Sequence, residues 1–114
     1  MRAVQIAFLG SLAWRYPALR GRLDEHLDDN EGEILPHVLM ADYERWAEEA
    51  LRSGDPLLTD FLNDLEAAYR TGGDEVEELI SVSFLEHLPR PGLAGAELRE
   101  LLGPSLLAQL GAIG

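Results

Sequence analysis

The sequence has neither cysteine nor lysine among its 114 residues. The absence of cysteine excludes disulfide bonds, thiolate catalysis and thiolate metal sites, and it is typical of a reducing compartment. No apolar run is long enough to span a bilayer. Gln5, Gly10 and Ser11 interrupt the apolar beginning of the chain, so we expect no secretory signal. The expected location is therefore cytoplasmic, without membrane contact.

Recognisable catalytic and ligand-binding motifs are missing as well. No serine lies in a Gly-x-Ser-x-Gly elbow, and no glycine-rich phosphate loop occurs. Neither His26 nor His37 has a second histidine three or four residues away on the same helix face. A calcium loop starting at Asp28 fails, because its glycine comes one position early at Gly32 and Leu39 replaces the bidentate glutamate. We predict no catalytic residue, no metal ligand and no cofactor.

What the chain does contain is helical periodicity. Apolar residues recur at helical spacing almost everywhere, and no segment alternates as a half-buried strand does. The predicted fold is all-α, with residues 1–114 forming one compact bundle of five to seven short helices, orthogonal or antiparallel. The expected helices cover about 3–14, 17–27, 36–53, 56–71 and 74–85, and Gly103-Pro104 divides a helical tail that starts near residue 96. A short solenoid of helical hairpins is the alternative, although no repeat of fixed period is present.

Short polar signals set the expected helix ends. Asp55 is expected to cap the fourth helix with Pro56 in its first position, and Asp74 and Glu77 have the spacing of a capping box for the fifth. Residues 28–33 contain no apolar side chain, and we expect a loop there. The residues expected to face the core are Val4, Ala7, Phe8 and Leu12 in the first helix and Leu39, Met40, Tyr43, Trp46, Ala47, Ala50 and Leu51 in the third.

Charge is strongly polarised along the chain, whose formal net charge is −12. Between Leu23 and His87 lie nineteen of the 21 carboxylates against three arginines, a formal charge of −16, whereas the first 22 residues carry four arginines and no acid. Eight acidic residues have no predicted structural role. They lie in the expected loop and on the polar face of the third helix. We call them the acidic cluster: Asp28, Asp29, Glu31, Glu33, Asp42, Glu44, Glu48 and Glu49. The cluster favours binding of a basic protein partner, and a merely solvated surface is the alternative.

The N-terminal arginines and the aromatic residues each allow two readings. Direct nucleic-acid binding is disfavoured by the net charge of −12, so the arginines are expected to be solvated or to dock against the acidic middle of the chain. Tyr43 and Trp46 lie on the apolar stripe of the third helix and are expected in the core. If a partner binds tightly it needs a buried anchor, for which Trp14 or an exposed edge of Trp46 are the candidates.

Three apolar stretches carry a resemblance to a known family. They are Leu35 to Asp42 (LPHVLMAD), Glu78 to Leu88 (ELISVSFLEHL) and Leu102-Gly103-Pro104-x-Leu106. Over most of its length the chain is similar to an uncharacterised family of small all-helical bacterial proteins, a domain of unknown function. The resemblance implies a helical core and a possible association with immunity proteins of bacterial toxin systems, and it supplies no catalytic residue.

The leading functional hypothesis is a small cytoplasmic binding protein that neutralises a basic partner, namely an immunity protein that occludes a toxin domain. The first alternative is a small hydrolase with a carboxylate pair in an interhelical cleft, recognisable by a pocket with carboxyl groups of raised pKa. The second is a structural or regulatory homo-oligomer, in which the arginine-rich first helix docks on the acidic middle of a neighbouring copy.

Overall fold

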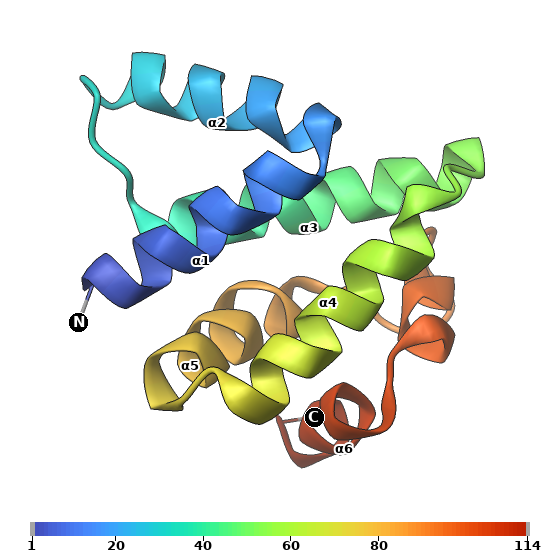
Figure 1. Cartoon of the computed structure of the whole chain (residues 1–114). Helices are drawn as coiled ribbons and strands as arrows, with labels where there is room; N and C mark the ends of the chain where they lie inside the picture. The colour runs from blue at the N-terminus through green and yellow to red at the C-terminus, as the bar shows by residue number, and fades with distance from the viewer. Residues whose placement is uncertain (1, 114) are drawn as a thin grey trace.

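The structure, a computed structural model, describes residues 2–113 and consists of helices joined by short connections (Figure 1). The elements, in order, are α1 (Arg2–Arg15), α2 (Pro17–Asp29), α3 (Pro36–Ser53), α4 (Leu57–Thr71), α5 (Asp74–Ser83), the 3-10 helices η1 (Leu85–His87) and η2 (Ala96–Leu101), and α6 (Pro104–Ile113). Within this range there are six α-helices and no strand. The predicted all-α bundle of five to seven short helices is confirmed.

Helix α3 is the longest element and packs against α1, α2, α4 and α5. Its range agrees with the predicted 36–53. Pro36 occupies its first position, where the missing N–H is not needed. It ends at Gly54, which adopts a left-handed conformation with φ of 69° and returns its N–H to the last turn. The apolar stripe of α3 is buried, and Tyr43 is fully enclosed.

Contacts between distant elements make the molecule a bundle rather than a solenoid. Helix α5 packs against α3 and α4, and also against α1, which is far away along the chain (Figure 1). In a solenoid each unit would contact only its neighbours. The Cα radius of gyration is 13.3 Å, which matches the value of about 13 Å expected for a compact domain of this length.

Aromatic rings from α3, α4 and two connections between helices meet in the core. Phe61 of α4 lies 5.1 Å from Trp46 and 5.6 Å from Tyr16, ring centre to ring centre, and both contacts are edge to face. Phe84 extends the group at 6.0 Å from Phe61. Such geometries add roughly 0.5–1.5 kcal/mol per pair beyond the area buried. The prediction that Tyr43 and Trp46 belong to the core is confirmed, and Trp46, 6% exposed, offers no edge to a partner.

The buried face of α1 differs from the prediction. Leu12 is buried as expected, but Val4 and Ala7 are exposed, and Gln5 and Leu9 face inward instead. The reason is that apolar residues occupy nearly every position from 3 to 9, so no single face is defined by the sequence. The choice is made by the neighbours: α2, α3 and α5 pack on the side of Leu9, and Gln5 donates a hydrogen bond to a carbonyl of α5.

The expected loop over residues 28–33 is wrong in its first part. Helix α2 continues through Asp29, and the turn begins at Asn30. His26, buried in spite of its polarity, holds this turn: its Nε2 accepts the N–H of Leu35 at 2.9 Å, and its carbonyl accepts the Asn30 amide at 2.8 Å. The histidine therefore has a local structural role.

The two expected caps behave differently. Asp55 Oδ1 accepts the N–H of Leu57 at 2.9 Å, so the capping contact is confirmed, although α4 begins at Leu57 rather than at the proline before it. The capping box of α5 is wrong. Gly73 precedes the helix with φ of 87°, and Asp74 is already its first residue, without a side-chain cap bond. The glycine makes the turn, and the carboxylate of Asp74 instead faces the positive end of the helix dipole.

The division of the tail at Gly103-Pro104 is confirmed, with η2 before it and α6 after it. The start of α6 is held from a distance, because the carboxylate of Glu66 in α4 accepts the N–H groups of Ser105 and Leu106, both at 3.0 Å. A Cβ on Gly103 would lie 2.7 Å from this carboxylate. Glycine is therefore required where the chain passes Glu66.

Candidate functional site

The structure separates the eight residues of the acidic cluster into three groups. The first group lies at the end of α2 and in the following turn, where Asp28, Asp29 and Glu31 are exposed and have no ion pair or side-chain hydrogen bond with residues 2–113. Glu33 is exposed too, but its carboxylate is 3.3 Å from the guanidinium of Arg2. Three of the predicted residues are thus available to a partner on this side.

The second group is neutralised within the molecule. Asp42 Oδ1 accepts from Arg22 at 2.9 Å and from Arg45 at 3.0 Å, and Glu49 pairs with the second nitrogen of Arg22. Arg22 belongs to α2, so these ion pairs fasten α2 to α3. The predicted role of Asp42 and Glu49 as free partner-binding charges is weakened, because both already share arginines.

The third group turns inward. Glu44, expected on the polar face of α3, is only 2% exposed, and its Oε2 has no hydrogen-bond partner within the described chain. Glu48 lies one turn further along, and a Cβ on Gly95 would be 3.3 Å from its Oε1. The segment before η2 therefore passes over this part of α3. The expectation that Glu44 belongs to an exposed acidic surface is wrong.

Burial dominates the titration of Glu44. Desolvation, together with the hydrogen bond and the negative charge of Glu48, raises the pKa of Glu44 to about 9, against a small opposing effect of Arg45. Two ionised carboxylates cannot hydrogen bond to each other, whereas a proton on Glu44 makes it a donor to Glu48. At neutral pH the pair therefore holds one proton in common.

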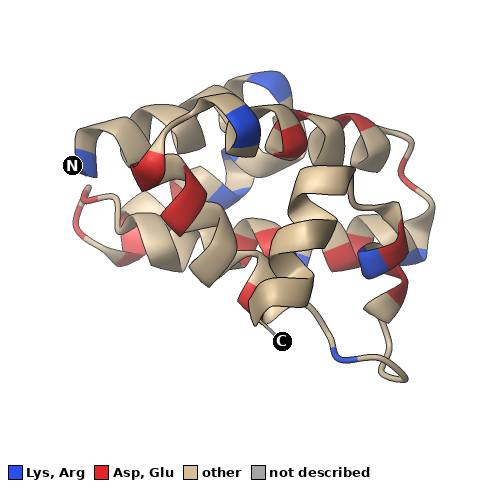
Figure 2. Cartoon of the chain, turned by 90° about the horizontal axis from the view of Figure 1, so that it is seen from below, with Lys and Arg blue, Asp and Glu red and all other residues tan. Residues whose placement is uncertain are grey.

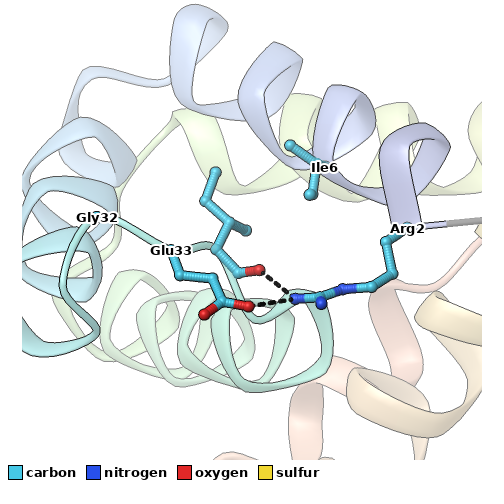
Figure 3. A pocket seen from close by; sticks show the side chains of 5 residues that line it. Arg2, Ile6, Gly32 and Glu33 are labelled. Atoms are coloured by element: carbon cyan, nitrogen blue, oxygen red, sulfur yellow. Dashed lines mark hydrogen bonds and ion pairs between the residues drawn. The ribbon is translucent and has the colours of Figure 1, made fainter.

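The arginine-rich beginning of the chain docks internally, one of the outcomes expected for it. Besides the pairs of Arg22, Arg15 contacts Asp64 at 2.8 Å. Arg2 reaches across a shallow cavity lined by Ile6 and Gly32, and it donates to Glu33 and, at 2.9 Å, to the carbonyl of Ile34 (Figure 3). These contacts tie α1 and α2 to segments far along the chain.

The largest group of carboxylates without a partner in the described chain lies along α2 and the turn after it. Acidic residues colour many elements in Figure 2, but most of those beyond α2 are isolated or paired. On α2 and its turn, five exposed acids have no ion pair or side-chain hydrogen bond in the part of the chain that is described; we call them the α2 acidic face: Asp24, Glu25, Asp28, Asp29 and Glu31. Spacings of four residues place Asp24 with Asp28 and Glu25 with Asp29 in two neighbouring rows along the helix, and Glu31 lies in the turn that follows.

An exposed tryptophan at the end of α1 lies beside the beginning of α2. Trp14 is 78% exposed, the largest fraction among the exposed large apolar side chains. Arg20 of α2 lies 5.5 Å above its ring, and Arg20 Nη2 donates to the Trp14 carbonyl at 2.6 Å. Arg20, Asp24 and Asp28 follow each other at four-residue spacing, so the tryptophan leads into one row of the α2 acidic face.

One cluster has the connectivity of a nucleophile, base and acid. His37 Nδ1 lies 2.5 Å from Ser83 Oγ, and its Nε2 lies 3.3 Å from Glu78 Oε1. Ser83, however, is 2% exposed and is the last residue of α5. At that end backbone carbonyls are free rather than the N–H groups that stabilise an oxyanion. The arrangement joins α3 to α5 and does not present a nucleophile to a substrate.

The hydrolase hypothesis required a pocket with carboxyl groups of raised pKa. A carboxyl group of raised pKa exists in Glu44, but three cavities of the described chain are lined by other residues. No group of three potential metal ligands occurs among the described residues. No helix in the same range is long and apolar enough to cross a membrane.

Two features were missed by sequence reasoning. Asp24 and Glu25 belong to the free acidic surface, and their spacing of four from Asp28 and Asp29 was a usable signal. Glu66 was missed for another reason, because its partners are backbone N–H groups about 40 positions away, which no local pattern indicates.

Comparison with known proteins places the chain in a family. No curated protein and no solved structure matches it significantly. A family model described as a domain of unknown function (DUF7674) matches residues 9–112, from α1 to the end of α6. The chain therefore belongs to the DUF7674 family, a domain of unknown function.

Proposed function

We propose that the protein binds a basic protein through the α2 acidic face and Trp14, and that this binding neutralises the partner as an immunity protein neutralises a toxin domain. The observation that carries the proposal is the arrangement along α2 and its turn: five exposed carboxylates without an ion pair among residues 2–113 continue from Trp14 at the end of α1, the more exposed of the two tryptophans. Neither feature contributes to the core or closes an internal ion pair.

The two parts have different physical effects. Unpaired carboxylates on one helix attract a positive surface over about a Debye length, roughly 8 Å at physiological salt, and so accelerate encounter. Rim charges of this kind add little affinity. A tryptophan that becomes buried contributes much more, typically 2 kcal/mol or above at a hot spot. Together they give a fast and tight complex with a cationic cleft.

Both earlier alternatives have less support. A hydrolase needs substrate access to its carboxyl groups, and Glu44 lies buried away from the described cavities. A homo-oligomer of the type considered above needs free N-terminal arginines, but Arg2, Arg15 and Arg22 already bind acids of their own chain.

The test is affinity capture with three matched baits. The first is the unmodified protein, the second carries Asp24→Asn, Asp28→Asn and Glu31→Gln, and the third carries the same charge change at exposed acids elsewhere: Asp60→Asn, Glu97→Gln and Glu100→Gln. We expect a basic protein to be retained at low salt by the first and third baits and lost from the second. Recovery of nothing basic, or equal recovery by all three baits, would contradict the proposal.

The neutralising role is tested with the protein so captured. Its expression alone should arrest growth, and co-expression of the unmodified chain should restore it. The variant Trp14→Ala should bind at least about 30-fold more weakly, as expected for loss of a hot spot of about 2 kcal/mol, and should restore growth poorly. If the captured partner is not toxic, the proposed binding function would stand and the immunity role would be refuted.

A further inference from the structure

A second cavity lies far from the α2 acidic face, at the end of the molecule formed by η1, the segment after it, η2 and the last turn of α6. Its volume is about 430 Å³, within the range of roughly 300–1000 Å³ typical of small-molecule sites. Leu85, Leu88 and Leu110 form its buried apolar wall, and Ile113, 37% exposed, lies at its mouth. The apolar part is thus aliphatic, without an aromatic ring.

Two arginines line the same cavity. Arg99 Nε donates to the carbonyl of Pro89 at 2.7 Å, which fixes the guanidinium, and its terminal nitrogens form no ion pair with residues 2–113. Arg90 is exposed and makes no side-chain hydrogen bond or ion pair with residues 2–113. Both arginines thus differ from Arg2, Arg15 and Arg22, whose guanidinium groups are occupied by acidic partners.

The charges at the rim limit what can bind there. The planar guanidinium group matches a carboxylate with two parallel hydrogen bonds, and prior fixation of Arg99 reduces the entropy lost on binding. Glu86 also lines the cavity, so the site has one net positive charge and disfavours a second negative charge on the ligand. Apart from Glu86, the residues that line the cavity provide no acidic side chain to accept the N–H groups of a peptide.

We propose that this cavity binds an aliphatic monocarboxylate, with the carboxylate held by Arg90 and Arg99 and the alkyl chain against Leu85, Leu88 and Leu110. The geometry pairs an anion-binding rim with an aliphatic wall at one end of the fold. The inference does not depend on the partner-binding function, because it shares no residue with the α2 acidic face.

The test uses the full chain with octanoate as the probe. Binding is measured by isothermal titration calorimetry and by amide chemical shifts in ¹H–¹⁵N spectra. Octanoate should bind with a Kd below about 1 mM, and the shifts should concentrate in η1, η2 and the end of α6. Octanol, of the same chain length without the charge, should bind at least about tenfold more weakly.

The matched variants are Arg90→Gln in the cavity and Arg52→Gln outside it, an exposed arginine that also forms no ion pair with the described residues. Loss of a charged hydrogen-bond partner should weaken octanoate binding about tenfold in the first and leave it unchanged in the second. Arg99→Gln should also weaken binding, and unchanged ¹H–¹⁵N shifts in the core would show that it folds.

Several results would overturn the inference. They are no octanoate binding at millimolar concentration, equal binding of octanol, an equal effect of Arg52→Gln, or shifts confined to other elements. Tighter binding of a short acetylated peptide ending in leucine than of octanoate would assign the cavity to a peptide terminus and likewise refute an aliphatic acid. None of these outcomes bears on capture of a basic protein by α2.

Discussion

Replacement of Glu44 by glutamine should stabilise the protein at neutral pH. In the folded state the pKa of this buried carboxyl is raised to about 9 from an ordinary value of 4.5, first by burial and then by Glu48. Folding therefore requires uptake of a proton above pH 4.5. Each pH unit above the ordinary pKa lowers the free energy of unfolding by about 1.4 kcal/mol, so at pH 7 this buried carboxyl destabilises the protein by roughly 3 kcal/mol.

The sign follows from proton linkage. Between the two pKa values the folded state binds more protons than the unfolded state, so stability falls as pH rises. Glutamine is neutral at every pH in this range, and its amide can donate to Glu48 as the protonated acid does. The gain from Glu44→Gln should be about 2–3 kcal/mol at pH 7 and fall below about 1 kcal/mol at pH 5. With about 4 °C per kcal/mol for a domain of this size, Tm should rise by about 10 °C at pH 7.

The assay is urea unfolding at intervals from pH 5 to pH 8.5, analysed as the difference between variant and parent so that other titrating groups cancel. Glu25→Gln provides the control, because Glu25 is exposed and has no ion pair or side-chain hydrogen bond with the described residues. Its difference should stay near zero throughout. A Glu44→Gln difference that does not change with pH, or one that is destabilising at pH 7, would refute the assignment of a buried shared proton.

Three further predictions concern the α6 cap and the two tryptophans. Burial would raise the pKa of Glu66, but hydrogen bonds from Leu106 and Ser105 outweigh it and lower the pKa. Glu66→Gln should therefore reduce the free energy of unfolding by about 1–2 kcal/mol at pH 7. This loss should disappear as pH falls through the lowered pKa, and urea unfolding at pH 7 and pH 3 measures it. Gly103→Ala should destabilise the protein by about 1–3 kcal/mol in thermal melts, because the new Cβ would lie 2.7 Å from the Glu66 side chain. Gly111 has open space around it, so the control variant Gly111→Ala should be neutral or stabilising by up to about 1 kcal/mol. Trp14→Phe should remove the iodide-quenchable part of the tryptophan fluorescence and change stability by less than about 0.5 kcal/mol, since the remaining tryptophan is buried; quenching that persists unchanged would contradict the exposure of Trp14.

Local features of the chain were sufficient for much of the fold. The helical spacing of apolar residues predicted the all-α class and the range of α3, and Gly103-Pro104 marked the break before α6. These signals work because helix hydrogen bonds and steric limits act over three or four residues. Where local features were ambiguous, prediction failed: α1 is apolar on several sides, and its buried face was chosen by α2, α3 and α5.

The sequence by itself determined the amount of negative charge and its position along the chain, but only the tertiary structure decided which carboxylates are free. Asp42 and Glu49 are neutralised by an arginine some 20 or more positions earlier, and Glu44 is covered in the fold although its own helix pattern assigns it to the polar face. Charge pairing and burial depend on approach in space, which local periodicity does not encode. Within the predicted cluster, the free acids therefore lie at the end of α2 and in the turn after it, rather than across the whole cluster.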